Sequence, residues 1–304
     1  MHFAVRRPVQ FAGLALVLGL AACGGDSNSP TSDSITADDA ESVGYAVMAN
    51  LYSSAYGMMD YEFSLFGPLF TARGPAAASF RSDIAKFSPT SCPSYEPDPF
   101  PDADEDGVPD NTVFSFDSAT CDTETESGIT NYFGSVRVSD PGANAGYDLD
   151  INGLGITLTP ADPQQPTEGI RWDGFRSLSG NASAVSLDEG FAFRFLQDNE
   201  TVLRMATQWD VAFLADVPGS IAFGEVLPAG DLDVDGALTV EGQGQRFILV
   251  VNTLDPLAWD PLCEDFVDGT FRVFAQGREG EGVIQVSFNA CGVAPTIVFL
   301  SNPV

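Results

Sequence analysis

The sequence predicts a mainly β protein: an antiparallel, sheet-rich body with one N-terminal α-helix. From Thr112 onward, apolar residues recur at every second position in one short segment after another, as in strands with one buried face. Glycine, proline, asparagine and aspartate separate these segments, whereas helical spacing is clearest before residue 60. A sandwich, a half-barrel and one large curved sheet all fit this pattern, and no clear internal repeat selects among them.

Residues 1–22 have the features of an export signal peptide. Two arginines precede the apolar run of residues 11–22, which is too short to span a bilayer. The run leads into "LAAC", Leu20 to Cys23, which resembles the lipobox of bacterial lipoproteins. The resemblance implies cleavage after residue 22 and acylation of Cys23 with palmitate-type chains, which anchor such proteins to a membrane.

The residue after the cysteine bears on location. In lipoproteins of bacteria with two membranes, Asp at this position commonly signals retention in the inner membrane, whereas this chain has Gly24. The resemblance therefore implies anchoring in the outer membrane, with the body either periplasmic or exposed at the surface. Residues 23–35 are rich in Gly, Ser and Asp and predict a lipidated, flexible tether. Residues 36–304 are expected to form a single domain.

The expected helix covers residues 37–59. Thr36 and Asp39 form a start like a capping box, in which Asp replaces the usual Glu. Acidic residues in the first turn complement the helix dipole. Apolar side chains then recur near helical spacing at Val43, Val47, Leu51, Ala55, Met58 and Met59. The sequence therefore predicts a helix that lies on an apolar surface.

The stretch "PDADEDGVPD", residues 101–110, places five carboxylates in ten positions. Calcium loops need oxygen ligands at alternate positions and a glycine at the sixth. The stretch resembles the D-x-D-x-D-G-x-x-D loop of thrombospondin type 3 repeats. That resemblance implies an acidic loop over residues 98–111 that holds a structural Ca²⁺ through Asp102, Asp104, Asp106, the carbonyl of Val108 and Asp110.

The likeness to a calcium loop ends at position twelve. Val113 stands there and has no acidic ligand to offer, which implies weak affinity or a ligand from elsewhere, such as Asp98. A solvated acidic loop is the alternative interpretation. Ala103 and Glu105 separate the acids, so the stretch has no apolar face to bury as a strand.

Two other acidic stretches are expected to be strands instead. In "GDLDVDGAL", from Gly230, and "YDLDINGLG", from Tyr147, apolar residues alternate with the acids. This pattern predicts strands that bury the apolar face and turn the acids to solvent. Asn152 and Gly153 in the second stretch predict a two-residue hairpin turn.

The strand segments predict which side chains face the core. The residues expected on the buried face include Phe114, Phe116, Val136, Val138, Phe191, Phe193, Phe195, Leu203, Met205, Thr207, Trp209, Val211, Phe213, Ile284, Val286 and Phe288. Residues 247–251 are apolar on both faces, which predicts a central strand. Residues 270–276 and 283–289 flank the glycine-rich "GREGEG" and predict a hairpin.

Four cysteines besides Cys23 fit an exported protein with two disulfides, for which three connectivities exist. We expect Cys92–Cys121 and Cys263–Cys291. The second pair lies near the open end of the predicted hairpin, where a bridge is geometrically easy. Zinc is disfavoured, because the spacings are far from C-x-x-C and no histidine follows the signal peptide.

Composition limits the function classes. The chain has 43 acidic and 13 basic residues and a formal net charge of −30, which repels nucleic acid. The single histidine, His2, belongs to the predicted signal peptide, so a mature chain would have no Ser-His-Asp or Cys-His machinery. Paired carboxylates can hydrolyse glycosides, but with so many acids the sequence does not single out a pair.

These patterns predict a non-catalytic, outer-membrane-anchored lipoprotein with a structural calcium site, acting in binding or as an envelope structural component. Its expected partners are the membrane, through the lipid anchor, and a protein, glycan or lipid ligand, but no nucleic acid. The alternative is a carrier of lipid or another apolar ligand in a half-barrel-like cavity. That layout is similar to half-barrel lipoprotein carriers, and the chain's 23 phenylalanines could line such a cavity.

Overall fold

The computed structural model describes residues 35–58, 92–97, 101–104, 108–125, 128–142, 146–222, 225–242 and 245–301. The predicted signal peptide, Cys23, nearly all of the tether and Met59 lie outside these residues. Within them, no helix is long and apolar enough to cross a membrane.

The described strands form one antiparallel sheet of 13 strands in which neighbours in sequence are nearly always neighbours in space. The order is β1-β2-β4-β5-β6-β7-β8-β9-β10-β11-β12-β13, and β3 pairs with β4 beside β2. The bounds are β1 Ser94–Glu96, β2 Asn111–Phe116, β3 Asp122–Thr125, β4 Gly128–Ser139, β5 Tyr147–Pro160, β6 Glu168–Asn181, β7 Ala184–Gln197, β8 Glu200–Ala215, β9 Gly230–Gly242, β10 Gln245–Asp260, β11 Asp265–Ala275, β12 Val283–Ser287 and β13 Thr296–Leu300.

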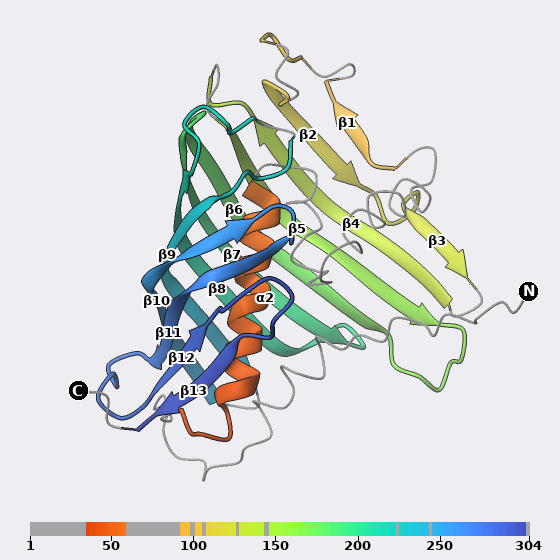
Figure 1. Cartoon of the computed structure of the whole chain (residues 1–304). Coiled ribbons are helices and arrows are strands. Elements are labelled where there is room, and N and C mark those ends of the chain that lie inside the picture. The colour runs from red at the N-terminus through yellow and green to blue at the C-terminus, as the bar shows by residue number, and fades with distance from the viewer. Residues whose placement is uncertain are drawn as a thin grey trace, which may run out of the picture.

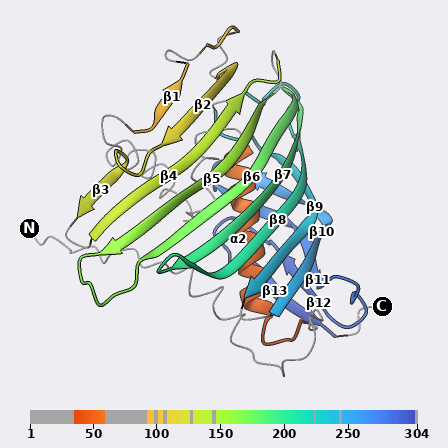
Figure 2. The same cartoon turned by 180° about the vertical axis from the view of Figure 1, so that it is seen from behind.

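The sheet curves around the single described helix, α2 (Ala40–Met58), which lies on its concave side (Figures 1 and 2). The predicted fold class is confirmed, and of the three arrangements the chain adopts one large curved sheet. It is an open sheet, since among the described strands the order ends at β1 and β13.

Helix α2 begins three residues later than predicted. Residues 36–39 form a turn before it, in which the backbone N–H of Thr36 donates to Asp39 Oδ2 at 3.0 Å. The backbone N–H of Asp39 donates to the Thr36 carbonyl at 3.2 Å, so the capping residues close a turn of their own. The predicted apolar face is confirmed by the buried side chains Val43, Val47, Leu51, Ala55 and Met58.

The concave face of the sheet forms the core together with α2. Most of the predicted inward residues are buried, and Phe114, Phe195 and Met205 pack against the core while partly exposed. The predicted hairpin is β11–β12, with Phe271 opposite Val286. Residues 247–251 belong to β10, which has β9 and β11 on its two sides, so that prediction is also confirmed.

The predicted hairpin turn at Asn152–Gly153 is wrong. Strand β5 continues through both residues, and its register with β4 and β6 shifts there, as at a β-bulge. Gly153 has φ +57°, and its N–H donates to Asp173 Oδ1 at 2.7 Å. A glycine in the left-handed region serves a bulge as well as a turn, so the dipeptide alone did not distinguish them.

Both predicted disulfides are present. The Cα atoms are 5.3 Å apart in Cys92–Cys121 and 5.7 Å apart in Cys263–Cys291. The second bridge joins the β10–β11 turn to the β12–β13 connection, at one end of the sheet.

The two ends of the sheet differ in what they carry. Ile35 lies at one end, beside the β11–β12 turn, where a Cβ on Gly282 would lie 3.4 Å from the Ile35 carbonyl oxygen. Helix α2 runs from there toward the opposite end, where the Tyr56 hydroxyl donates to the Glu264 carbonyl at 2.8 Å. We call these the entry end and the far end.

Candidate functional site

The predicted calcium loop lies at the far end, between β1 and β2 (Figure 1). Its two described sides meet. The backbone N–H of Ala103 donates to Asp110 Oδ1 at 3.1 Å, and the backbone N–H of Asp110 donates to the Pro101 carbonyl at 2.8 Å. The backbone N–H of Asp140 donates to the Asp110 carbonyl at 3.3 Å and joins the loop to the end of β4.

This closure fits a loop that wraps a cation, because it joins position nine to position two and to the residue that precedes position one. Val108, whose carbonyl is a predicted ligand, is buried at the base of the loop. Asp106 and Asp98 lie outside the described residues. In the described part of the chain, no group of three or more acidic, histidine or cysteine side chains gathers as a metal site. The calcium site therefore stays a prediction.

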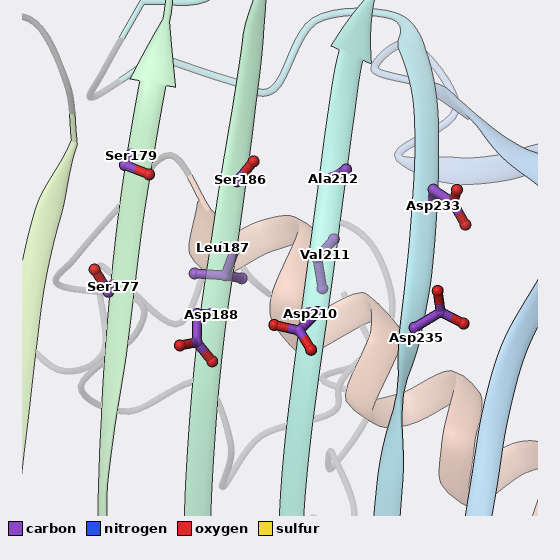
Figure 3. Close-up of a pocket in the computed structure, with 10 residues that line it drawn as sticks. All are labelled: Ser177, Ser179, Ser186, Leu187, Asp188, Asp210, Val211, Ala212, Asp233 and Asp235. Atoms are coloured by element: carbon purple, nitrogen blue, oxygen red, sulfur yellow. The ribbon is translucent and has the colours of Figure 1, made fainter.

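A second acidic feature lies on the convex face of the sheet, away from α2 (Figure 3). Strand register aligns Asp148 with Ser177, Ser177 with Asp188, Asp188 with Asp210, and Asp210 with Asp235. We call these five residues the carboxylate row. It runs across β5 to β9 and borders a shallow hollow of about 330 Å³ that Asp233 also lines.

The ends of the carboxylate row are hydrogen-bonded. The Ser177 hydroxyl donates to Asp148 Oδ1 at 2.5 Å, and the Asn252 amide donates to Asp235 Oδ1 at 2.6 Å. Asp188 and Asp210 lie between them. Desolvation raises the pKa of Asp188, and the Asp210 charge raises it further. Like charges directly opposite each other destabilise a sheet, so the row costs stability and attracts cationic groups.

A buried ion pair lies on the other face of the same strands. Arg176 on β6 and Glu189 on β7 are opposite each other in register, and both are almost fully buried beneath α2. Arg176 Nε donates to Glu189 Oε2 at 2.6 Å, and the Ser54 hydroxyl of α2 donates to Glu189 Oε1 at 2.5 Å. Tyr147 also hydrogen-bonds the guanidinium.

The electrostatics keep this arginine charged. Burial lowers the pKa of Arg176, but the charge of Glu189 and the contact with Tyr147 outweigh it, so the net shift is upward. The guanidinium also lies over the Phe191 ring, 5.4 Å from its centroid. With the carboxylate shared between Arg176 and Ser54, the cluster holds α2 on the sheet rather than presenting a reactive group to solvent.

The sequence interpretation found the loop and missed the other two features. It expected the acids of residues 230–238 to face solvent, and Asp231, Asp233 and Asp235 are exposed on β9 as expected. The sequence did not predict that they align with Asp188 and Asp210, because local patterns do not determine the register between neighbouring strands. No protein-family model, curated protein or solved structure matches the chain.

Proposed function

We propose that the protein is a non-catalytic lipoprotein anchored in the outer membrane through Cys23. Its body acts in binding or as a structural part of the envelope and is stabilised by calcium in the loop of residues 98–111. The lipobox and the composition motivate the anchor and the non-catalytic role. The observation that carries the calcium site is the closure of the loop through Asp110.

The residues that would hold the ion are Asp102, Asp104, Asp106, the carbonyl of Val108 and Asp110. Bound calcium would supply positive charge among five carboxylates. The chain's own contribution is to hold the loop in its closed form. Asp110 does so through its bond to Ala103, and the Cys92–Cys121 disulfide closes the surrounding segment. The role of such a site is to clamp a long connection and not to promote a reaction.

Thermal unfolding of the full chain carrying Cys23→Ser, in EDTA and in about 1 mM calcium, tests the calcium site. Loops of extracellular modules bind with Kd of about 10⁻⁴–10⁻³ M. At a Kd of ~10⁻⁴ M, 1 mM calcium would stabilise the folded chain by about 1.4 kcal/mol. For a body of this size, that corresponds to a rise in Tm of about 3–5 °C.

The rise should disappear in Asp106→Ala and persist in Asp231→Ala, which removes an exposed acid of β9 that does not line the hollow and matches the change in net charge. An equal rise in all three proteins would mean that calcium acts through the overall negative charge. The absence of any rise would make the stretch a solvated acidic loop.

A carrier of lipid or another apolar ligand is the second candidate. The observation that favours it is the curved sheet whose concave face is apolar. The side chains of α2 fill that face where the helix lies, and the hollow of about 330 Å³ lies on the convex face, which favours the first proposal. Lipid that co-purifies with the chain in stoichiometric amount, detected by mass spectrometry, would reverse this preference.

A further inference from the structure

The most exposed aliphatic side chains of the described residues all lie at the far end of the sheet. Leu262 is 94% exposed, Val226 68%, Val217 65%, Leu214 59% and Val293 52%. They come from the end of β8, the β8–β9 connection, the β10–β11 turn and the β12–β13 connection. We call these five residues the aliphatic rim.

The connections that carry the rim are tied together. The Trp259 indole N–H donates to the Leu227 carbonyl at 3.3 Å and joins the β8–β9 connection to the end of β10. The backbone N–H of Asp216 donates to the Ala229 carbonyl at 3.0 Å and closes that connection at its base. The Cys263–Cys291 disulfide places the segment of Leu262 beside that of Val293. Backbone segments held in this way lose little further freedom when the surface that they carry binds a partner.

The charged residues of the connections that carry the rim have one sign. The β8–β9, β10–β11 and β12–β13 connections contain no lysine or arginine. They contain Asp216, Glu225 and Glu264, of which the first two are exposed and the third is half-buried. Single exposed aliphatic side chains are ordinary on a protein surface. Several of them on connections that are joined to one another, with acidic residues beside them, form a surface that is complementary to an apolar face bordered by basic residues.

The rim also lies away from the point where the chain enters the body. Ile35 is at the entry end, and the 19 residues of α2 span about 28 Å toward the far end. If the tether leads to a lipid on Cys23, the rim lies at the end of the body opposite to that attachment. This orientation rests on the proposed function, whereas the composition of the rim does not.

We propose that the aliphatic rim is a docking surface for a protein whose contact face combines an apolar pocket with lysine or arginine at its border. A bilayer is a poorer match, because interfacial segments use aromatic and basic residues and the rim offers neither. A second copy of this chain is also a poorer match, because two bodies with a net charge of −30 repel each other.

The probe is a fluorescent 14-residue peptide of leucine and lysine in helical spacing, titrated with the full chain carrying Cys23→Ser. The Leu262→Ser/Val293→Ser variant should weaken binding about tenfold. The matched control Ile129→Ser/Val202→Ser removes two exposed aliphatics at the entry end and should change Kd less than twofold. All three proteins have the same N-terminal segment, so any contribution of that segment to the Kd is the same in each.

Three outcomes overturn the proposal. Equal Kd values for the two variants would mean that the peptide binds through charge alone. Flotation with phosphatidylcholine vesicles that is lost in the rim variant would assign the rim to a membrane. A dimer in sedimentation that is lost in the rim variant would assign it to a second copy. Repeating the titration in EDTA and in calcium shows whether peptide binding at the rim depends on the proposed calcium site, so that the two proposals can fail independently.

If the double variant has a lower Tm than the native chain, the single variant Leu262→Gln is used instead. Leu262 is so exposed that its side chain contributes little to the stability of the fold. Its binding defect should then be smaller but of the same sign. An unchanged Kd in Leu262→Gln would count against the rim as the docking surface.

Discussion

Glu189→Gln is the most informative perturbation of the fold, because it removes one charge of the buried ion pair and keeps the side-chain volume. In the native chain, Glu189 accepts hydrogen bonds from Arg176 and from Ser54 of α2. The substitution leaves the Arg176 charge beneath the helix without its carboxylate. Removal of one partner of a buried pair costs about 3–5 kcal/mol.

The structure supports the upper part of that range. Glu189 is 2% exposed and Arg176 1%, so water does not replace the lost carboxylate. Domains of ordinary stability unfold with about 5–15 kcal/mol, so the substitution should remove a large share of the total. Urea unfolding, followed by fluorescence and by circular dichroism, measures this loss as a lower midpoint at an unchanged slope.

The control is the preceding residue on the same strand, Asp188. Asp188 points to the convex face, so Asp188→Asn neutralises an acid without touching the core. It should change stability by less than about 1 kcal/mol. The double variant Arg176→Met/Glu189→Leu should recover most of the loss, because apolar replacements of a buried pair are often neutral or stabilising. A loss below about 1 kcal/mol in Glu189→Gln would refute the reasoning, since it would mean that the pair is solvated.

Two further predictions concern the convex face and the anchor. Because the pKa of Asp188 is raised in the folded chain, its ionised form costs stability above that pKa, and the cost disappears as the pH falls below the ordinary range of Asp. Asp188→Asn should therefore be slightly more stable than the native chain at pH 7 and equally stable near pH 3. Denaturation midpoints across pH measure this, and a gain that persists at pH 3 contradicts it. Cys23→Ser should abolish the incorporation of labelled palmitate, and a native chain that remains unlabelled contradicts the lipobox assignment.

Much of the fold could be predicted from the local pattern of apolar and polar residues. Alternation of apolar residues depends only on the two faces of a strand, so the inward positions of β4, β7, β8 and β12 were predicted correctly. The Cys263–Cys291 bridge followed from the predicted β11–β12 hairpin, because the two cysteines lie just beyond its open end. These features need no pairing beyond that of two strands joined by a short turn.

Features that depend on the register between strands could not be predicted from the sequence. Arg176 and Glu189 both occupy inward positions of their strands, in phase with the buried Leu178 and Leu187, so each is a charged residue at a position that usually carries an apolar one. That signal was present in the sequence. Their mutual contact required the pairing of β6 with β7, and the contact with Ser54 required the position of α2. The carboxylate row was missed for the same reason.

The described contacts of α2 explain why the far end can be a defined surface. The side-chain hydrogen bonds that join α2 to the described sheet come from Tyr52, Ser54 and Tyr56, in the second half of the helix. Ser54 reaches β7 on one side, while Tyr52 and Tyr56 reach Asp265 and Glu264 at the start of β11.

These bonds have direction, unlike the apolar contacts of the rest of the helix, so they fix where α2 stops along the sheet. Glu264 is also the neighbour of Cys263, whose disulfide joins the two segments that carry Leu262 and Val293. The buried ion pair, the second half of α2 and the aliphatic rim therefore form one connected structure. Its polar bonds are buried or partly buried on the inside, and its aliphatic side chains are exposed at the tip.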